Sequence, residues 1–115
     1  MLDTEMTVEV VEGEITKVVF SGRLDSIGAA SVAQRFKGVV ADERAVIVDL
    51  SDVEYIASLA IRFLVAGANT VKNNGGKLIL LSPQEYVHDV LKTAAIDTIV
   101  PILFDLSGSI AAVHP

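Results

Sequence analysis

Residues 45–64 read AVIVDLSDVEYIASLAIRFL, and this stretch decides the fold class. Its first part, residues 45–50, is a mainly apolar run, as expected of a strand covered on both faces of a sheet. From Ser58 onward the apolar residues follow helical spacing, and the predicted helix continues to Lys72. A buried strand that leads into an amphipathic helix is typical of an α/β fold.

Further elements flank this stretch. The sequence predicts a hairpin of strands at 6–11 and 15–20, a helix from 26 to 40 capped by Asp25 or Ser26, a strand at 77–81, a helix from Pro83 to Ala94, a short strand at 99–104 and a helix at 106–113. Helices between successive buried strands imply right-handed crossovers. We therefore expect one α/β domain over residues 1–115, with an N-terminal hairpin, a small and mainly parallel sheet, and about four helices.

Composition excludes several classes of function. The net charge of -6 argues against nucleic acid and against an anionic membrane surface, since both attract basic proteins. The chain has no cysteine, which excludes disulfides and thiolate metal sites. Its acidic start is unlike a signal peptide, and no apolar run approaches the roughly 20 residues of a membrane span. The sequence predicts a cytoplasmic protein with no direct membrane insertion.

Few side chains are arranged for catalysis. His88 and His114 are isolated, without partners at metal-ligand spacing. The segment 73–77, NNGGK, lacks the flanking residues of a phosphate-binding Walker loop, so its glycines indicate a helix stop. Asp49 ends a buried strand, where functional groups often lie, but spacing supports no catalytic pair, and a structural role is favoured. We expect no enzyme, no metal and no cofactor.

Ser58 has two open interpretations. Serine is a favoured N-cap residue, whose hydroxyl accepts a hydrogen bond from a first-turn amide. The same place also suits a phosphoryl group, because the helix start offers amides and the positive end of the helix dipole. Phosphorylation would add close to two negative charges and change the affinity for a partner.

The helix after Ser58 has two apolar faces. The larger face is predicted to pack on the sheet and contains Ile61, Leu64, Val65, Ala68 and Val71. Leu59, Phe63 and Ala66 fall on the opposite face, beside Arg62. Either a neighbouring helix or the sheet edge covers them, or they form an exposed patch for a partner. The sequence leaves both interpretations open.

Three motifs resemble those of the STAS domain, the fold of bacterial anti-sigma factor antagonists. They are Ser21-Gly22-Arg23-Leu24-Asp25 after a strand, the segment from Val48-Asp49-Leu50 to Tyr55-Ile56 before a helix, and Gly75-Gly76-Lys77-Leu78 opening a strand. The resemblance spans nearly the whole chain in the right order. It departs from the family at the motif Asp-Ser-Ser/Thr-Gly, which reads Ala57-Ser58-Leu59-Ala60 here, and Arg62 replaces a usually small residue.

The resemblance implies a regulatory binding protein. Ser58 falls on the serine that family members have phosphorylated by a partner kinase, and the implied docking residues are Asp25, Ala57, Ser58, Leu59, Arg62 and Phe63. The implied partners are an anti-sigma factor with serine-kinase activity and a serine phosphatase, with the protein a monomer or weak dimer. An alternative is a non-phosphorylated scaffold or accessory subunit of a stressosome-like or lipid or anion transport assembly.

Overall fold

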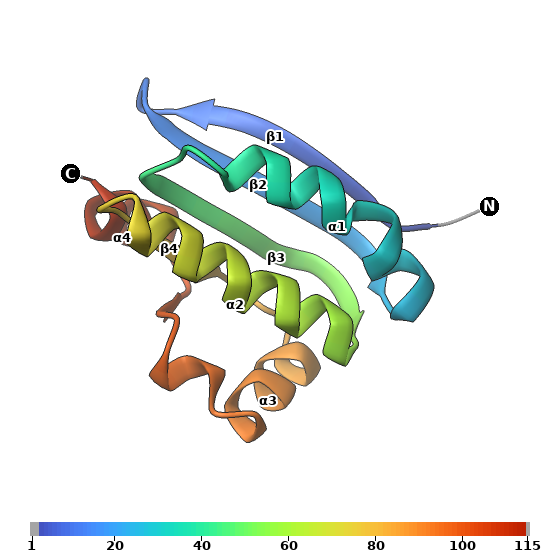
Figure 1. Ribbon diagram of the computed structural model, residues 1–115. Coiled ribbons are helices and arrows are strands. Elements are labelled where there is room, and N and C mark those ends of the chain that lie inside the picture. The colour runs from blue at the N-terminus through green and yellow to red at the C-terminus, as the bar shows by residue number, and fades with distance from the viewer. Residues whose placement is uncertain (1–2, 115) are drawn as a thin grey trace.

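The central feature of the computed structural model, which describes residues 3–114, is a five-stranded sheet with its strands in chain order (Figure 1). The strands are β1 (Glu5–Val11), β2 (Ile15–Leu24), β3 (Ala45–Ile56), β4 (Lys77–Leu81) and β5 (Ile102–Leu103). The helices are α1 (Ser26–Val40), α2 (Ser58–Asn73), α3 (Glu85–Thr93) and α4 (Leu106–Val113), with a short 3-10 helix, η1 (Ile96–Thr98), after α3.

The pairing of the strands confirms the predicted architecture. β1 and β2 form an antiparallel hairpin, whereas the β2–β3, β3–β4 and β4–β5 pairs are parallel. The four α-helices and the mainly parallel sheet are those of an α/β fold. Parallel strands that run in one direction bring the starts of the following helices to one end of the sheet.

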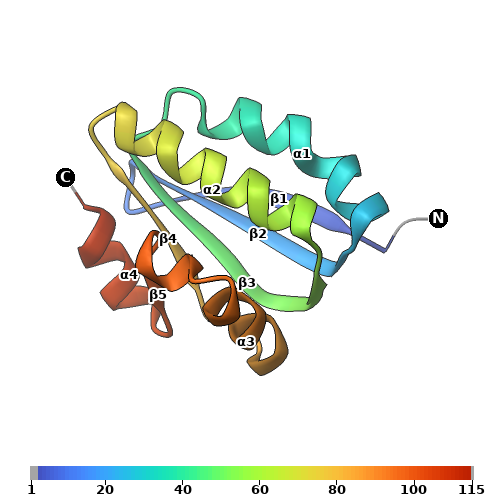
Figure 2. The ribbon, with the colours of Figure 1, turned by 60° about the horizontal axis from the view of Figure 1, so that its bottom comes forward.

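The two faces of the sheet are covered unequally (Figure 2). The main hydrophobic core lies between one face of the sheet and the helices α1, α2 and α3. Its fully buried side chains include Phe20, Phe36 and Leu64. α4 packs on the other face over a smaller cluster around Ile47 and Ile79. The larger core therefore lies on the face of the sheet that carries α2, the helix that begins at Ser58.

β3 is longer than the sequence predicts. The predicted strand covered residues 45–50, but β3 continues through residues 51–56, because Ser21–Leu24 of β2 pair with Asp52–Ile56 through two register shifts. The polar side chains of Ser51, Asp52 and Glu54 are exposed there, which explains their turn-like composition. The extension carries the chain to the start of α2.

Two predicted boundaries near the C-terminus were wrong. α3 begins at Glu85 with Gln84 as its N-cap, so Pro83 precedes the helix. Gln84 donates a side-chain hydrogen bond of 2.8 Å to the carbonyl of Ser51, which holds this turn against β3. The last strand is only Ile102–Leu103, which pairs with Leu80 and Leu81 of β4, because the chain before it forms η1 with Ile99 as its C-cap.

The end of α2 confirms the predicted helix stop. Gly75 takes a positive φ of 88°, and its N–H donates to the carbonyl of Lys72 at 2.9 Å. The N–H of Gly76 donates to the carbonyl of Val71, also at 2.9 Å. This pair of bonds is the Schellman motif, which satisfies the last carbonyls of a helix.

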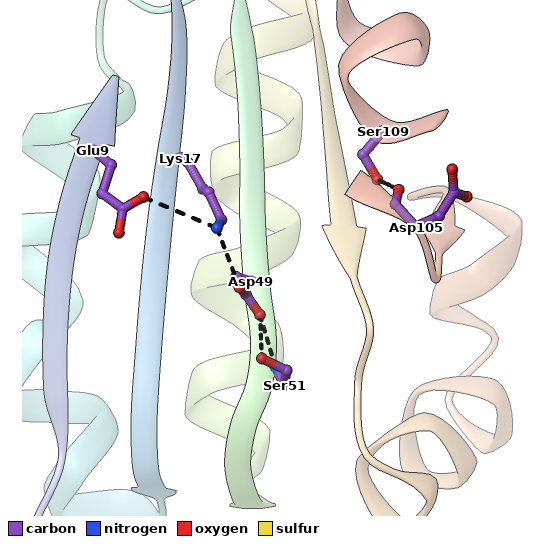
Figure 3. Close-up of polar contacts among 6 residues, drawn as sticks. All are labelled: Glu9, Lys17, Asp49, Ser51, Asp105 and Ser109. Atoms are coloured by element: carbon purple, nitrogen blue, oxygen red, sulfur yellow. Dashed lines mark hydrogen bonds and ion pairs between the residues drawn. The ribbon is translucent and has the colours of Figure 1, made fainter. Parts of the chain in front are cut away.

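An ionic network lies on the face of the sheet away from α1 and α2 (Figure 3). Lys17 Nζ lies 3.6 Å from Asp49 Oδ2 and 4.0 Å from Glu9 Oε2. Asp49 Oδ1 also accepts hydrogen bonds from the N–H and hydroxyl of Ser51, at 2.9 and 2.7 Å. These contacts join three strands, in agreement with the structural role favoured for Asp49.

The outer edge of β1 is contacted by a side chain from α1. Arg35 Nη1 donates a hydrogen bond of 2.6 Å to the carbonyl of Met6. Farther along the strand, Val8 and Val10 are exposed. Arg35 thereby joins the helical layer to the edge of the sheet.

Candidate partner-binding site

A groove lies at the end of the sheet where α1 and α2 begin. Its volume is about 490 Å³, and its lining includes Ser26, Tyr55, Ser58, Leu59, Arg62 and Val90. These residues come from the first turns of α1 and α2, the end of β3 and the middle of α3. Ser58 is exposed in this groove as the first residue of α2.

The interpretation of Ser58 as an N-cap was wrong. Ala57 is the N-cap, with extended backbone angles of φ -101° and ψ 167°, and its carbonyl accepts from the N–H of Ile61 at 3.1 Å. The N–H of Ala57 donates to the carbonyl of Leu24 at 2.8 Å, so this residue still belongs to the β2–β3 pairing. Among residues 3–114 no side chain caps α2, and the Ser58 hydroxyl has no capping role.

The start of α1 is built differently. Asp25 is its N-cap, and Asp25 Oδ1 accepts a hydrogen bond of 2.8 Å from the N–H of Gly28. Its other oxygen lies 3.9 Å from Arg23 Nε, and the side chain keeps 43% of its surface exposed. The fold therefore brings Asp25 to the same end of the sheet as Ser58, as a helix cap that a partner can still reach.

A neighbouring helix covers part of the second apolar face of α2, whereas Ala66 on that face is exposed. The Phe63 ring lies 5.2 Å from that of Phe36 on α1 and 5.7 Å from that of Phe20 on β2, measured between centroids. Phe63 and Leu59 are half-buried and pack against the main core. Of the two interpretations left open, cover by a helix therefore holds for Phe63, whereas Leu59 also lines the groove.

Arg62 is the charged residue of the groove. It is exposed, and within the described chain no other charged side chain lines the groove. It makes no ion pair or hydrogen bond with any of residues 3–114. A cationic side chain without a partner beside Ser58 is available to an anionic group.

Sequence reasoning missed a stack of side chains beside the groove. The rings of Tyr55 and Tyr86 stack at 5.9 Å with an interplanar angle of 16°, and the Arg23 guanidinium lies 4.7 Å from the centre of the Tyr55 ring. Tyr86 is 54% exposed, so a partner can reach this stack. The available signal was that the only two tyrosines of the chain lie next to predicted helix starts.

The histidines take no part in this groove. The His88 ring packs edge-on against Phe104, with centroids 5.2 Å apart. Residues 3–114 contain no group of three or more side chains that could together hold a metal ion. The helices of the same range are too short or too polar for any of them to cross a membrane.

Comparisons with known proteins agree with one another. The family model of the STAS domain matches residues 6–109. BtrV of Bordetella bronchiseptica, which carries the name of an anti-sigma factor antagonist, is 26% identical over 112 residues, covering 94% of this chain and 93% of BtrV.

Two solved structures share the fold. An anti-sigma factor antagonist from Mycobacterium paratuberculosis superposes with a TM-score of 0.87 at 23% identity, over 98% of this chain and 96% of that one. SpoIIAA, a Bacillus cell fate determinant solved in its phosphorylated form, gives a TM-score of 0.70 at 14% identity, over 93% of this chain and 97% of that one. At these identities the likeness concerns the fold.

Proposed function

Because the chain belongs to the STAS domain family, as its motifs predicted, we propose that it is an anti-sigma factor antagonist switched at Ser58. The family consists of regulatory binding proteins rather than typical enzymes. In this proposal residues 1–115 act as one STAS domain in the cytoplasm, as a monomer or weak dimer. The protein binds an anti-sigma factor that is also a serine kinase, and so frees a sigma factor.

The observation that carries the proposal is the position of Ser58. It is exposed as the first residue of an uncapped helix and lies in an open groove of about 490 Å³. SpoIIAA has been solved in a phosphorylated form, and BtrV carries the name of an antagonist. Phosphate at this place meets the positive end of the α2 dipole, which favours an anion.

The switch is a phosphoryl transfer. The Ser58 oxygen attacks the γ-phosphorus of ATP held by the kinase, a new P–O bond forms, and ADP leaves as the hydroxyl proton passes to a base of the kinase. A serine phosphatase reverses the change by hydrolysis, which releases inorganic phosphate and restores the hydroxyl. The phosphate brings close to two negative charges to the surface.

The docking surface in this proposal surrounds Ser58. It consists of Asp25, Ala57, Leu59, Arg62 and the accessible part of Phe63. Because Ser58 is exposed, phosphate there leaves the core intact and acts on the partner instead. We therefore expect phosphorylation to weaken docking without unfolding the domain.

Mass spectrometry tests the acceptor. The protein is incubated with its cognate kinase and ATP, and the phosphorylated residue is mapped in the wild type and in Ser58→Ala. We expect one phosphate, on Ser58, that disappears in the variant. A kinase that binds the protein but leaves Ser58 unmodified would rule out the switch.

Binding measurements test the docking face. Ser58→Asp introduces negative charge into the groove, and we expect affinity for the kinase to fall at least about tenfold, a cost of about 1.4 kcal/mol. The matched control is Ser107→Asp, since Ser107 is also an exposed serine in the first turn of a helix, α4, on the other face of the sheet. Equal affinities for all three proteins would place the interface elsewhere.

A second candidate function is favoured by a different surface. Ile99, Phe104 and Leu106 are exposed around the short edge strand β5, and none of them lines the groove that contains Ser58. A non-phosphorylated scaffold or accessory subunit of a stressosome-like or transport assembly would use such apolar residues and would not need Ser58. Light scattering during size-exclusion chromatography separates the two: a stable oligomer favours the scaffold, and a monomer favours the antagonist.

A further inference from the structure

Arg62 is placed to act on the same residue that carries the proposed switch. Ser58 and Arg62 both lie on α2, four positions apart, and both line the groove. Residues at this spacing are neighbours on one side of a helix, with Cβ atoms about 5–6 Å apart. The reach of an arginine side chain exceeds that separation.

The electrostatic surroundings of Arg62 favour this contact. The protein carries a net charge of -6, yet within residues 3–114 Arg62 is the one charged side chain that lines the groove. It forms no ion pair or hydrogen bond with the described residues, so no existing interaction has to break. An acidic group four positions before a basic one is also the more favourable order along a helix.

We propose that Arg62 is an intramolecular phosphate clamp: its guanidinium pairs with the phosphate once Ser58 is phosphorylated. A guanidinium presents a planar fork of N–H donors that matches two phosphate oxygens. Phosphorylation then does more than add charge to the docking surface. It also takes Arg62 away from the partner and holds the phosphate against α2.

This inference rests on the proposed function, because it concerns the phosphorylated state of Ser58. The test therefore makes that state without the kinase. Phosphoserine is installed at position 58 during translation by stop-codon suppression, in the wild type and in three variants. Arg62→Gln removes the charge, and Arg62→Lys keeps the charge but loses the fork.

The third variant, Arg44→Gln, is the matched control. Arg44 is likewise exposed and without an ion pair among residues 3–114, but it precedes the start of β3, whereas Ser58 follows its end. The substitution Arg44→Gln makes the same change in net charge as Arg62→Gln, but at the opposite end of β3. Comparing the two variants therefore separates a direct contact between Arg62 and the phosphate from a general effect of net charge.

The measurement is a ³¹P NMR titration of the phosphoserine at low salt. We expect the second pKa of the phosphate to be lower in the wild type than in Arg62→Gln by about half a unit, corresponding to roughly a threefold change in the ionisation constant. Arg44→Gln should match the wild type, and Arg62→Lys should lie between. The difference should shrink in 1 M salt, since exposed charges are screened.

Equal phosphate pKa values in the wild type and Arg62→Gln would overturn the clamp. A second test needs no variant. On phosphorylation of Ser58 the NMR resonance of the Arg62 Nε–H should shift in the wild type, and an unchanged resonance would contradict the clamp. Failure of the kinase to modify Ser58 would instead sink the proposed function and leave the titration result unaffected.

Discussion

α1 and α2 start side by side at one end of the sheet, but their first turns are built differently. Asp25 caps α1 through the N–H of Gly28, whereas α2 follows Ala57, whose side chain cannot cap. A cap satisfies an amide that otherwise lacks a partner in the helix. One start is completed within the protein, and the other leaves amides and the Ser58 hydroxyl for something else to contact.

The difference teaches how a small domain can separate stability from function. Helix starts at the carboxyl ends of parallel strands are a common place for binding sites. Closing α1 with an aspartate stabilises the fold, while leaving α2 open gives up some stability at the proposed docking site. Natural proteins often give up local stability where they function.

The largest expected effect concerns the aromatic contact that couples the two helices. Phe36 of α1 is 1% exposed and packs on Phe63 of α2, so Phe36→Ala leaves a cavity and should lower the free energy of unfolding by about 3–5 kcal/mol. Phe63→Ala should cost less, about 2 kcal/mol, because the ring is only half-buried. Urea unfolding followed by circular dichroism measures both.

The exposed ring of Tyr86 provides the control for these aromatic substitutions. Tyr86→Ala should change stability by no more than about 1 kcal/mol, the usual value of an aromatic pair. If Phe63→Ala were as mild as Tyr86→Ala, Phe63 would belong to the docking surface rather than to the contact between helices.

A medium effect is expected from removing the side-chain cap at the start of α1. Asp25→Ala removes the acceptor of the Gly28 N–H and should destabilise the protein by about 1 kcal/mol. Asp25→Asn is the matched variant, since asparagine caps equally well without the charge that faces Arg23. Both unfolding free energies come from urea titrations. Equal losses in the two variants would assign the effect to the ion pair instead of the cap.

The smallest effect is expected from adding a side-chain cap to the start of α2. Ala57 already has the extended backbone of an N-cap, so Ala57→Asp should raise the free energy of unfolding by about 0.5–1 kcal/mol. Thermal unfolding detects the gain as a higher midpoint. Ala57→Val is the control, since it cannot cap, and no difference between the two variants would mean that the α2 amides already have equivalent partners.

Strong local patterns made most of the fold predictable. α4 was predicted with its observed bounds, and β4 likewise, because an apolar run and a helical period are each visible within a few residues. The extension of β3 through Ser51 and Glu54 was not predictable in this way. Those residues join the sheet by pairing with β2, and distant pairing leaves no mark on local periodicity.

The candidate site was predictable in position but less so in detail. The segment from Val48 to Ile56 and the helical spacing after it placed Ser58 at the helix start. Its role as a cap depended on where the backbone leaves the strand, and the Ala57–Leu24 hydrogen bond sets that point. Whether Phe63 is exposed depended on where α1 lies. The stack of Tyr55 and Tyr86 joins β3 to α3, so neither segment alone reveals it.

The contact between Arg35 and the Met6 carbonyl has a consequence for aggregation at high protein concentration. A bordering strand with uncovered valines is a template on which a second chain can add a strand of its own. The Arg35 guanidinium occupies one backbone acceptor that an added strand would need, and Arg35 belongs to α1, the helix that Asp25 caps. Local unfolding of α1 would therefore free this acceptor, and self-association would begin at the edge strand β1 rather than from the hydrophobic core.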